Sequence, residues 1–271
     1  MYTIGEVSKI CNVSKKTLRY YDEIGLISPD VVSKENNYRF YSKDTLLFVP
    51  VIKYYKQMGF KLEEMRDLVQ GNSYNEHERS FFQKIEDLNE QEKQIRMAHL
   101  SVGEWYKLIQ EASSVIKNNV TDVCIKYLEP MTTCYMEQTF MQNYKESIIN
   151  IEWTNYLEGY NLAIIGAVNL WFENFREKNK GEFCKCRIFQ RNLTEESDIP
   201  MMSIGGSMVA SCYHIGSHET LYRTYDKIIE WAEKHGYECS EESIERYVTD
   251  YWTIQSSEEF VTEIMIKVTR K

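Results

Sequence analysis

The start of the chain carries the pattern that most restricts its fold, two short helices separated by a tight turn. Thr3 stands at an N-cap position with Glu6 three residues later, which is a capping box that opens a helix. Ser14 caps a second helix, Lys15–Glu23, and Gly25 ends it. In a helix-turn-helix the second helix enters the major groove of DNA by its N-terminal end. The pattern therefore predicts a DNA-binding fold.

The residues that follow and the surface of the second helix fit this interpretation. Two extended runs, 31–32 and 38–41, flank the polar segment 33–37, which predicts a hairpin or wing. The N-terminal half of the second helix offers cations and a hydroxyl that can reach phosphates and base edges. These residues are Lys15, Lys16, Thr17 and Arg19.

Two segments in this region resemble the MerR family of transcription regulators. They are RYYDEIGL at 19–26 and NYRFY at 37–41, in the family's order and spacing. The wing of the family often carries an arginine after its first strand, whereas here Ser33-Lys34 occupies that place; a lysine can still reach a phosphate. The resemblance implies DNA contacts by two groups of residues, Lys16, Arg19 and Tyr20 on the helix and Tyr38 and Arg39 on the wing, and we add Lys15, Thr17 and Lys34.

An alternative reading of the same residues is structural. Leu18, Tyr20, Tyr21 and Leu26 could form only a core, because helix-turn-helix shapes also occur in proteins that never touch DNA. The wing and the family spacing together favour DNA binding.

The distribution of charge separates the N-terminal part from the rest. The net charge of the 271 residues is −9, but residues 1–70 hold 11 Lys+Arg and 9 Asp+Glu, against 21 and 32 in the remainder. The weakly basic head predicts modest nonspecific affinity, so tight binding should require a dimer. No apolar run approaches the ~18 residues of a membrane span, and seven scattered cysteines suit a reducing cytoplasm.

The middle of the chain predicts helices. Ser42 should cap a helix that runs to residue 58 with a kink at Pro50, and a short helix over 61–70 should end at Gly71. Residues 75–118 contain no proline and should form one helix. At ~1.5 Å per residue it would exceed 60 Å, longer than a small domain is wide.

An apolar seam of coiled-coil type along this helix predicts dimerisation. Packing of the helix on its own domain is the alternative. Glu92 and His99 inside the seam could fix register or lie at solvated positions. The resemblance to MerR regulators implies an antiparallel dimer helix. The seam positions are Phe81, Ile85, Leu88, Glu92, Ile95, His99, Val102, Tyr106, Ile109, Ser113 and Ile116.

Beyond residue 119 short β-branched and tyrosine-rich runs alternate with two helical patterns, 142–158 and 219–235. This predicts an α+β domain with a helix-backed antiparallel sheet. The expected strands are 123–128, 132–139, 162–169, 184–189, 207–214, 243–251 and 260–268. The predicted organisation is a winged helix-turn-helix domain at 1–71, a coiled-coil dimerisation helix at 75–118 and an effector-binding domain at 120–271.

The C-terminal part resembles the gyrase-inhibitor-like effector-binding domain, clearly over 213–268 and faintly over 120–200. The resemblance is carried by the segments His214-Ile215-Gly216, His235-Gly236-Tyr237, Ile244-Glu245-Arg246-Tyr247 and Thr262-Glu263-Ile264, and by the helix 221–231. It implies two pseudo-repeated halves around an aromatic cleft, with a strand glutamate facing the ligand. Glu245 falls at that position, and Phe260 stands where multidrug-binding relatives carry a tyrosine.

A half-buried Glu245 without a lysine partner would attract a lipophilic cation, because an unpaired carboxylate out of water is costly. Aromatic rings add cation–π attraction without demanding one ligand shape. As alternatives, Glu245 could pair with Arg246 or Lys267 at the surface, and many tyrosines could be ordinary core. The candidate walls are Tyr127, Tyr135, Tyr144, Tyr156, Trp171, Tyr247, Trp252 and Phe260.

The remaining motifs predict no catalytic residue, metal or cofactor. Cys184-x-Cys186 could hold a soft metal or form a redox pair, but it lacks a third ligand nearby, and His214 and His218 are expected to be a structural pair. No Ser-His-Asp order, zinc motif or phosphate-binding glycine loop occurs.

Three functions follow from the sequence. The first, which we favour, is a ligand-responsive regulator, an activator, that binds promoter DNA as a dimer and distorts the promoter spacer for RNA polymerase when an aromatic or cationic molecule fills the pocket. The others are a metal- or thiol-responsive regulator using Cys184 and Cys186, and a small-molecule hydrolase with a pocket glutamate as general base.

Overall fold

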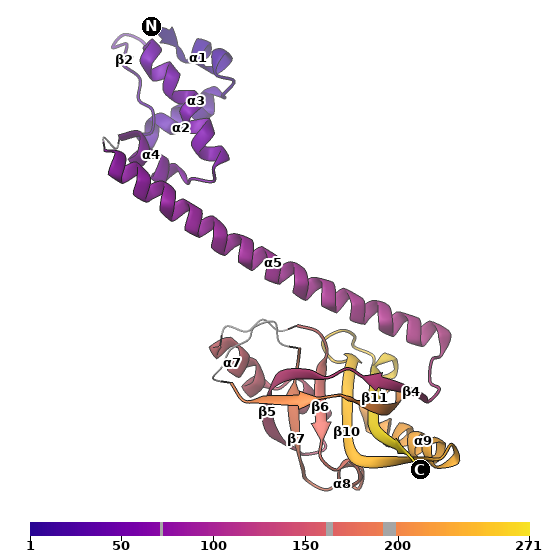
Figure 1. The fold of residues 1–271 in the computed structure, drawn as a ribbon. Coiled ribbons are helices and arrows are strands. Elements are labelled where there is room, and N and C mark those ends of the chain that lie inside the picture. The colour runs from indigo at the N-terminus through magenta and orange to yellow at the C-terminus, as the bar shows by residue number, and fades with distance from the viewer. Residues whose placement is uncertain (71–72, 161–164, 192–198) are drawn as a thin grey trace. The chain divides into compact units, whose positions relative to one another are not determined.

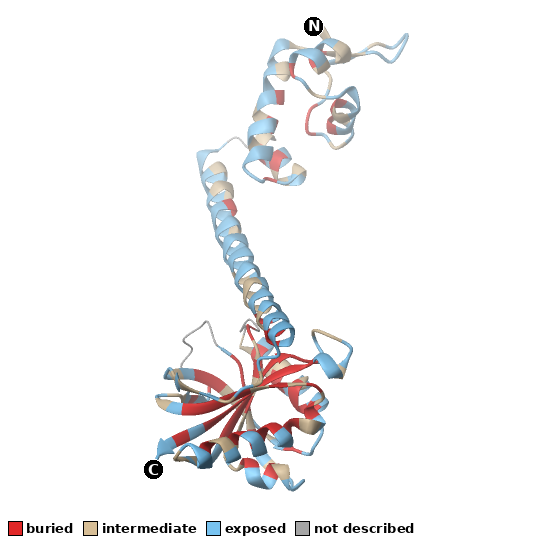
Figure 2. Cartoon of the chain, turned by 90° about the vertical axis from the view of Figure 1, so that its right-hand side faces the viewer, coloured by how far each residue is buried: buried red, intermediate tan, exposed pale blue. Residues whose placement is uncertain are grey.

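The computed structural model describes all residues except 71–72, 161–164 and 192–198. The chain divides into two compact units, Met1–Gln94 and Ile95–Lys271, each with its own buried core (Figures 1 and 2). The combination of a helical head, a long helix and a sheet domain confirms the predicted fold class. No described helix combines the length and the apolarity needed to cross a membrane.

The first unit begins with the predicted helix-turn-helix. The hydroxyl of Thr3 accepts the Glu6 amide at 3.3 Å while the Glu6 carboxylate accepts the Thr3 amide at 2.7 Å, so the capping box is present. Ser14 Oγ accepts the Thr17 amide at 3.0 Å, and Gly25 ends the second helix at φ +70°. The elements are β1 (Tyr2–Thr3), α1 (Ile4–Ile10), α2 (Lys15–Glu23), β2 (Val31–Val32), β3 (Arg39–Tyr41), α3 (Lys43–Gln57) and α4 (Leu62–Gln70).

The wing is the predicted hairpin, with an additional strand. β2 pairs with β3 antiparallel, and β1, which the sequence did not predict, pairs with the other edge of β3. The core of this unit buries Leu18, Tyr21 and Leu26, whereas Tyr20 of the same helix is exposed. The alternative prediction, that all four residues serve only as core, therefore holds for Leu18, Tyr21 and Leu26 but not for Tyr20.

Pro50 lies inside α3, as predicted, where it cannot donate to the Leu46 carbonyl. That carbonyl instead accepts a hydrogen bond from the Cys11 thiol, at an Sγ–O distance of 3.8 Å. Cys11 is the C-cap of α1, so the carbonyl that the proline leaves free links α3 to the end of α1. The predicted kink stays a prediction. The predicted C-cap Gly71 lies outside the described residues.

The 45-residue helix α5 (Tyr74–Asn118) confirms the long-helix prediction. Phe81 packs on the core of the first unit, and Leu108, Ala112 and Val115 pack against Val248 and Val261 in the second. Apart from Phe81, the large apolar residues of the predicted seam are exposed. They are Ile85, Leu88, Ile95, Val102, Tyr106, Ile109 and Ile116.

Within the described residues the second unit forms one antiparallel eight-stranded sheet with α9 (Leu221–Lys234) packed on one face (Figure 1). In spatial order the strands are β4 (Cys124–Leu128), β9 (Ser207–Ile215), β11 (Val261–Arg270), β10 (Tyr237–Thr249), β6 (Val168–Phe172), β7 (Cys184–Phe189), β5 (Met131–Phe140) and β8 (Met201–Ile204). The shorter elements are α6 (Tyr144–Ile148), α7 (Ile151–Gly159), α8 (Phe175–Asn179), η1 (His218–Thr220) and η2 (Ser257–Glu259).

Three local predictions were wrong in detail. The strand expected over 243–251 begins six residues earlier, at Tyr237, and ends at Thr249. The single helix expected over 142–158 is two helices, because Asn150 caps α7 by accepting the Trp153 amide at 2.9 Å and the preceding Ile149 is not helical. The strand expected over 162–169 begins at Val168 and continues to Phe172, and residues 161–164 of that prediction lie outside the described residues. The four-residue strand β8 was not predicted.

Candidate effector site and DNA-binding surface

The exposed face of α2 presents the predicted DNA-binding side chains. Lys15, Lys16, Arg19 and Tyr20 are exposed, while Thr17 is half-buried, its Oγ1 2.7 Å from Ser14 Oγ. Thr17 therefore takes part in the cap of the helix. The remaining side chains are exposed, and their contacts with phosphates or base edges stay a prediction.

Of the three predicted wing contacts, two are exposed side chains and one is bonded within the protein. Lys34 and Tyr38 are exposed. Arg39 donates from Nε to Asp22 Oδ2 at 2.7 Å, which links the wing strand β3 to helix α2. The guanidinium therefore fixes the wing against the helix that it flanks, a role that the sequence did not indicate.

Glu245 lies in the middle of the sheet of the second unit, on β10, and is completely buried. Its Oε1 accepts a hydrogen bond from the Tyr225 hydroxyl at 2.8 Å and its Oε2 accepts one from the Tyr247 hydroxyl at 2.5 Å. Lys178 Nζ forms a salt bridge with Oε1. Both carboxylate oxygens are therefore satisfied within the protein.

The Lys178 side chain reaches this carboxylate from α8, and only 2% of it is exposed. Its Nζ lies over three rings, 4.5 Å from the centroid of Tyr225, 4.9 Å from that of Phe172 and 5.4 Å from that of Tyr144. The expectation of a half-buried Glu245 without a lysine partner was wrong, because a lysine 67 positions away in sequence supplies the cation. The alternative pairing with Arg246 or Lys267 is not the one observed.

The cage, by which we mean Glu245, Lys178 and the rings around them, is thus electrically neutral in sum. Burial, and secondarily the Glu245 charge, raises the pKa of both Tyr225 and Tyr247 well above the ordinary value. The phenols stay protonated and donate to the carboxylate. A ring-lined site of this kind can hold a cation by charge and by ring faces together.

His218 closes one side of the cage, where its ring packs against other rings. Its ring stacks on Phe260 at 4.8 Å and lies 5.1 Å from Tyr247 and 5.4 Å from Tyr144. Neither ring nitrogen bonds to any described residue, although the side chain is buried. His214, expected to form a structural pair with it, is bonded to the neighbouring loop, with Nδ1 2.8 Å from Thr224 Oγ1. Only His214 is therefore held by hydrogen bonds.

Burial lowers the pKa of His218 to about 3, so this imidazole is neutral in the folded protein. The unfolded chain, with a pKa near 6.5, binds the extra proton as the pH falls. The free energy of unfolding should therefore decrease as the pH falls from 7 to 3, the range set by the two pKa values. Between pH 7 and pH 5 the expected decrease is about 2 kcal/mol.

A His218→Phe substitution, which keeps the ring, should remove this acid sensitivity. Urea unfolding at pH 7 and pH 5 measures it, and His235→Gln is the control because that side chain is exposed. An equal loss of stability in wild type and His218→Phe would contradict the prediction.

Of the predicted walls, Tyr144, Tyr247 and Phe260 meet around Glu245, whereas Trp171 and Tyr135 do not. Trp171 is paired in register with Ile244, the neighbour of Glu245, so it lies on the opposite face of the sheet. The Arg187 guanidinium lies over Trp171 at 4.8 Å and over Tyr135 at 4.9 Å. These two rings form a separate cluster there.

The other three predicted walls also lie elsewhere. Tyr127 is on the edge strand β4 and half-exposed, Tyr156 stacks on Trp153 at 5.7 Å, and Trp252 lies 6.2 Å from Trp105 of α5. The cage residues that the sequence analysis missed are Phe172, Phe175, Lys178, His218, Tyr225 and Tyr251. Tyr225 lies in the helix 221–231, which carries part of the resemblance but marked no site residue, and no sequence signal marked Lys178.

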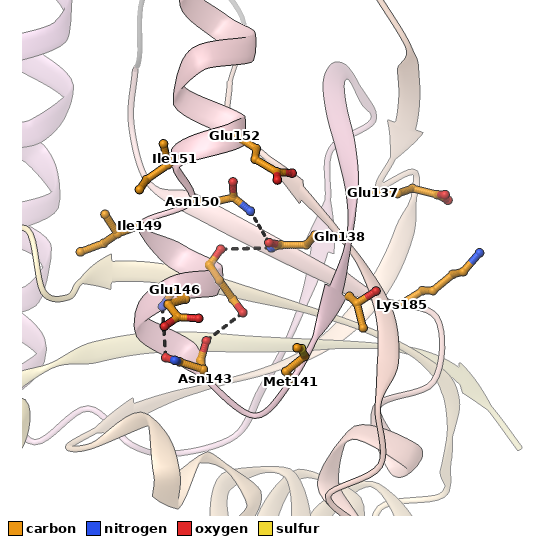
Figure 3. Close-up of a pocket in the computed structure, with 12 residues that line it drawn as sticks. Glu137, Gln138, Met141, Asn143, Glu146, Ile149, Asn150, Ile151, Glu152 and Lys185 are labelled. Carbon is orange, nitrogen blue, oxygen red and sulfur yellow. Dashed lines mark hydrogen bonds between the residues drawn. The ribbon is translucent and has the colours of Figure 1, made fainter.

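An open hollow of about 610 Å³ lies apart from the cage, between β5 and the α6–α7 segment (Figure 3). Its lining mixes apolar side chains with the carboxylates of Glu137, Glu146 and Glu152, and Asn150 donates a hydrogen bond to Gln138 across it. None of the predicted ligand-binding residues lines this hollow, so it does not replace the cage as the candidate site.

The residue after Glu245 faces away from the cage and binds α5. Arg246 donates from Nη1 to Glu111 Oε2 at 3.1 Å and from Nε to Glu263 Oε2 at 2.9 Å, and the Tyr213 hydroxyl donates to Glu111 at 2.7 Å. Burial alone would raise the pKa of Glu263, but Arg246 and Lys126 outweigh it and lower that pKa. The network joins the sheet to the last turns of α5.

The cysteine pair offers little for metal or redox chemistry. Cys184 and Cys186 are on β7, and burial raises the pKa of Cys186 to about 12 and also raises that of Cys184. Metal ligation and thiol exchange require the thiolate, which these values disfavour. The described residues contain no group of three His, Cys, Asp or Glu side chains that could hold a metal ion.

Comparison with known proteins finds two family matches in the chain. Residues 2–72 match the family described as MerR HTH family regulatory protein, and residues 121–269 match the GyrI-like small molecule binding domain. The Multidrug-efflux transporter 2 regulator of Bacillus subtilis is 26% identical over 98% of this chain and 96% of its own length. The Multidrug-efflux transporter 1 regulator of the same organism is 35% identical over 45% of this chain and 49% of its own length.

A similar chain occurs among solved structures, in a cryo-EM structure of an EcmrR–DNA complex. It is 24% identical, with full coverage of both chains and a TM-score of 0.46. The two family matches lie one in each compact unit. The chain belongs to the MerR family of transcription regulators and carries a GyrI-like small molecule binding domain.

Proposed function

We propose that this regulator acts as a homodimeric activator that binds promoter DNA through α2 and the wing, and that an aromatic or cationic small molecule in the Glu245 cage switches it. The observation that carries the proposal is the cage itself: a fully buried carboxylate surrounded by aromatic rings and a cation, in the same chain as a winged helix-turn-helix.

The chemistry of the cage supports an organic cation as effector. The carboxylate and the ring faces of Tyr144, Phe172 and Tyr225 already hold one ammonium group, that of Lys178. The two Bacillus subtilis relatives are named as regulators of multidrug-efflux transporters. Lipophilic cations of varied shape are therefore the proposed effector class for this chain.

The exposed seam of α5 supports a dimer. Large apolar side chains left in water along a helix indicate a protein partner, and a second copy of the same helix satisfies them symmetrically. The proposed assembly places two DNA-binding heads on one promoter, which raises the affinity of a weakly basic head.

The dimer proposal predicts the effect of charges in the seam. Ile95→Glu combined with Val102→Glu should convert the dimer to monomers at micromolar concentration, because four carboxylates would be buried between the helices. Sedimentation equilibrium measures this. Lys93→Glu, on the other side of α5, is the control and should remain dimeric; a dimer of unchanged affinity in the double variant would exclude the seam as the interface.

In the proposed mechanism the dimer distorts an over-long promoter spacer so that RNA polymerase engages both promoter elements. Smooth bending of a short duplex costs of order 1–6 kcal/mol, which protein–DNA contacts can supply. The effector shifts the balance between two protein conformations by its different affinities for them.

The test is a footprint on the promoter upstream of the protein's own gene, with and without a panel of aromatic cations. We expect protection of a pseudo-palindromic site in both conditions and a change of the footprint in the spacer when a cation is present. Absence of any protection at low salt would contradict the DNA-binding proposal, and a footprint that no cation alters would contradict the effector proposal. A hydrolase role would require Glu245 as a free base, whereas both of its oxygens are bonded.

A further inference from the structure

The ammonium group of Lys178 is held in the way that proteins hold organic cations. It has one carboxylate partner, Glu245, and the faces of three rings within 5.4 Å of Nζ. Charge pairing and ring faces are the two interactions by which aromatic cages bind quaternary ammonium ligands. A side chain of the protein therefore occupies the position that an external cation would take.

The filled cage is sealed. Glu245 is 0% exposed and Lys178 is 2% exposed, so no guest reaches the carboxylate while the lysine is in place. His218 beside it keeps both ring nitrogens without a partner among the described residues, which is the arrangement of a polar group that a guest could bond. The Glu245 and Lys178 charges are therefore paired in this site, whereas the His218 nitrogens are left without a hydrogen bond to any described residue.

The segment that carries Lys178 is short. α8 has five residues, and its inner contacts besides the ion pair include the stacking of Phe175 on Tyr225 at 4.9 Å and a hydrogen bond from Gln142 Nε2 to the Lys178 carbonyl at 3.0 Å. Asn174 caps one end and Gly181, at φ +82°, follows the other. Phe175 is buried in the core and anchors the helix, so displacement of the ammonium group requires movement of the flexible Lys178 side chain alone.

We propose that Lys178 is a tethered occupant of the effector cage, and that an effector binds by displacing its ammonium group from Glu245. This inference rests on the proposed function, since it concerns the same cage, and it adds how the site is regulated and which ligands it admits.

Displacement selects for charge. A guest without charge that expels Lys178 leaves Glu245 buried and unpaired, which is strongly unfavourable. A cationic guest exchanges one ion pair for another, so the carboxylate keeps a partner while the lysine gains water. The tethered lysine thus excludes neutral aromatic compounds and weakens every cation by the free energy of its own release.

The test compares full-length wild type with Lys178→Met, which keeps an unbranched side chain of nearly the same length and removes its charge. Lys180→Met is the matched control, because Lys180 is an exposed lysine at the end of the same helix. The probes are benzyltrimethylammonium and its uncharged carbon analogue neopentylbenzene, and binding is measured by calorimetry. We expect Lys178→Met to bind the cation at least tenfold more tightly than wild type, with Lys180→Met equal to wild type and little gain for the neutral compound.

Equal or weaker binding of the cation by Lys178→Met would overturn the inference and leave the proposed function intact. If neither protein binds the cation at millimolar concentration, the cage is not an effector site for cations of this kind, and the proposed effector class fails together with the inference.

A second measurement uses the wild-type protein, should Lys178→Met fail to fold. Acetylation with N-hydroxysuccinimidyl acetate, followed by peptide mass spectrometry, reports which lysines are in water. We expect Lys178 to be protected in the free protein and to be modified when the cation saturates the site. Continued protection of Lys178 in the saturated protein would show that the guest does not displace it.

Discussion

An Arg19→Ala substitution should weaken binding of the dimer to its promoter at least 30-fold and leave effector binding unchanged. Arg19 is exposed on α2, where a guanidinium can reach a base edge or phosphates. A good bidentate contact is worth about 1–3 kcal/mol, and each variant dimer loses it in two half-sites, which gives about 2–6 kcal/mol. Fluorescence anisotropy with a labelled promoter fragment at fixed salt measures the change.

Arg79→Ala is the matched control, an exposed arginine at the start of α5 outside the predicted DNA-binding surface. It should bind DNA as wild type does. Calorimetry with a cationic ligand completes the experiment, because the cage belongs to the other compact unit. A loss of DNA binding and ligand binding together in Arg19→Ala would contradict separate functions for the two units.

Glu245→Gln should lower the free energy of unfolding of the second unit by about 3–5 kcal/mol, because it leaves the Lys178 ammonium buried without its carboxylate. The amide has nearly the same shape, so the effect comes from charge. All five tryptophans are in this unit, from Trp105 to Trp252, and their fluorescence during urea unfolding therefore reports on it.

The double variant Glu245→Gln with Lys178→Met separates charge from packing. It should recover most of the lost stability, because both charges are gone. Glu245→Gln should also weaken cationic ligands more than neutral ligands of like shape. Equal stability losses in the single and double variants would assign the effect to packing, and equal losses of affinity for both ligand classes would remove the charge argument.

The DNA-binding head could be predicted closely because its determinants are local. Thr3 with Glu6, Ser14 with Thr17, and Gly25 act within three residues of the helix ends that they fix. The long helix was predictable for the same reason, since a 45-residue stretch without proline has few alternatives.

The cage could not be predicted to the same depth, because its members come together from distant parts of the chain. Lys178 and Glu245 are 67 positions apart, and no local sequence pattern near either residue predicts their contact. Trp171 shows a second limit: in a strand the face alternates with each residue, so a prediction that names the strand but not the register cannot say which side a ring takes. Tyr247 was placed correctly because it stands two residues from Glu245.

Strand β10 presents two adjacent residues to two different surroundings, Glu245 to the cage and Arg246 to Glu111 on α5. Successive side chains of a strand point to opposite faces of the sheet, so the carboxylate of the cage and the guanidinium that binds α5 are carried back to back by neighbouring residues. Helix α5, which Arg246 contacts at Glu111, is one continuous helix that begins at Tyr74. One step along β10 therefore separates the candidate effector site from the helix on which the proposed dimer depends.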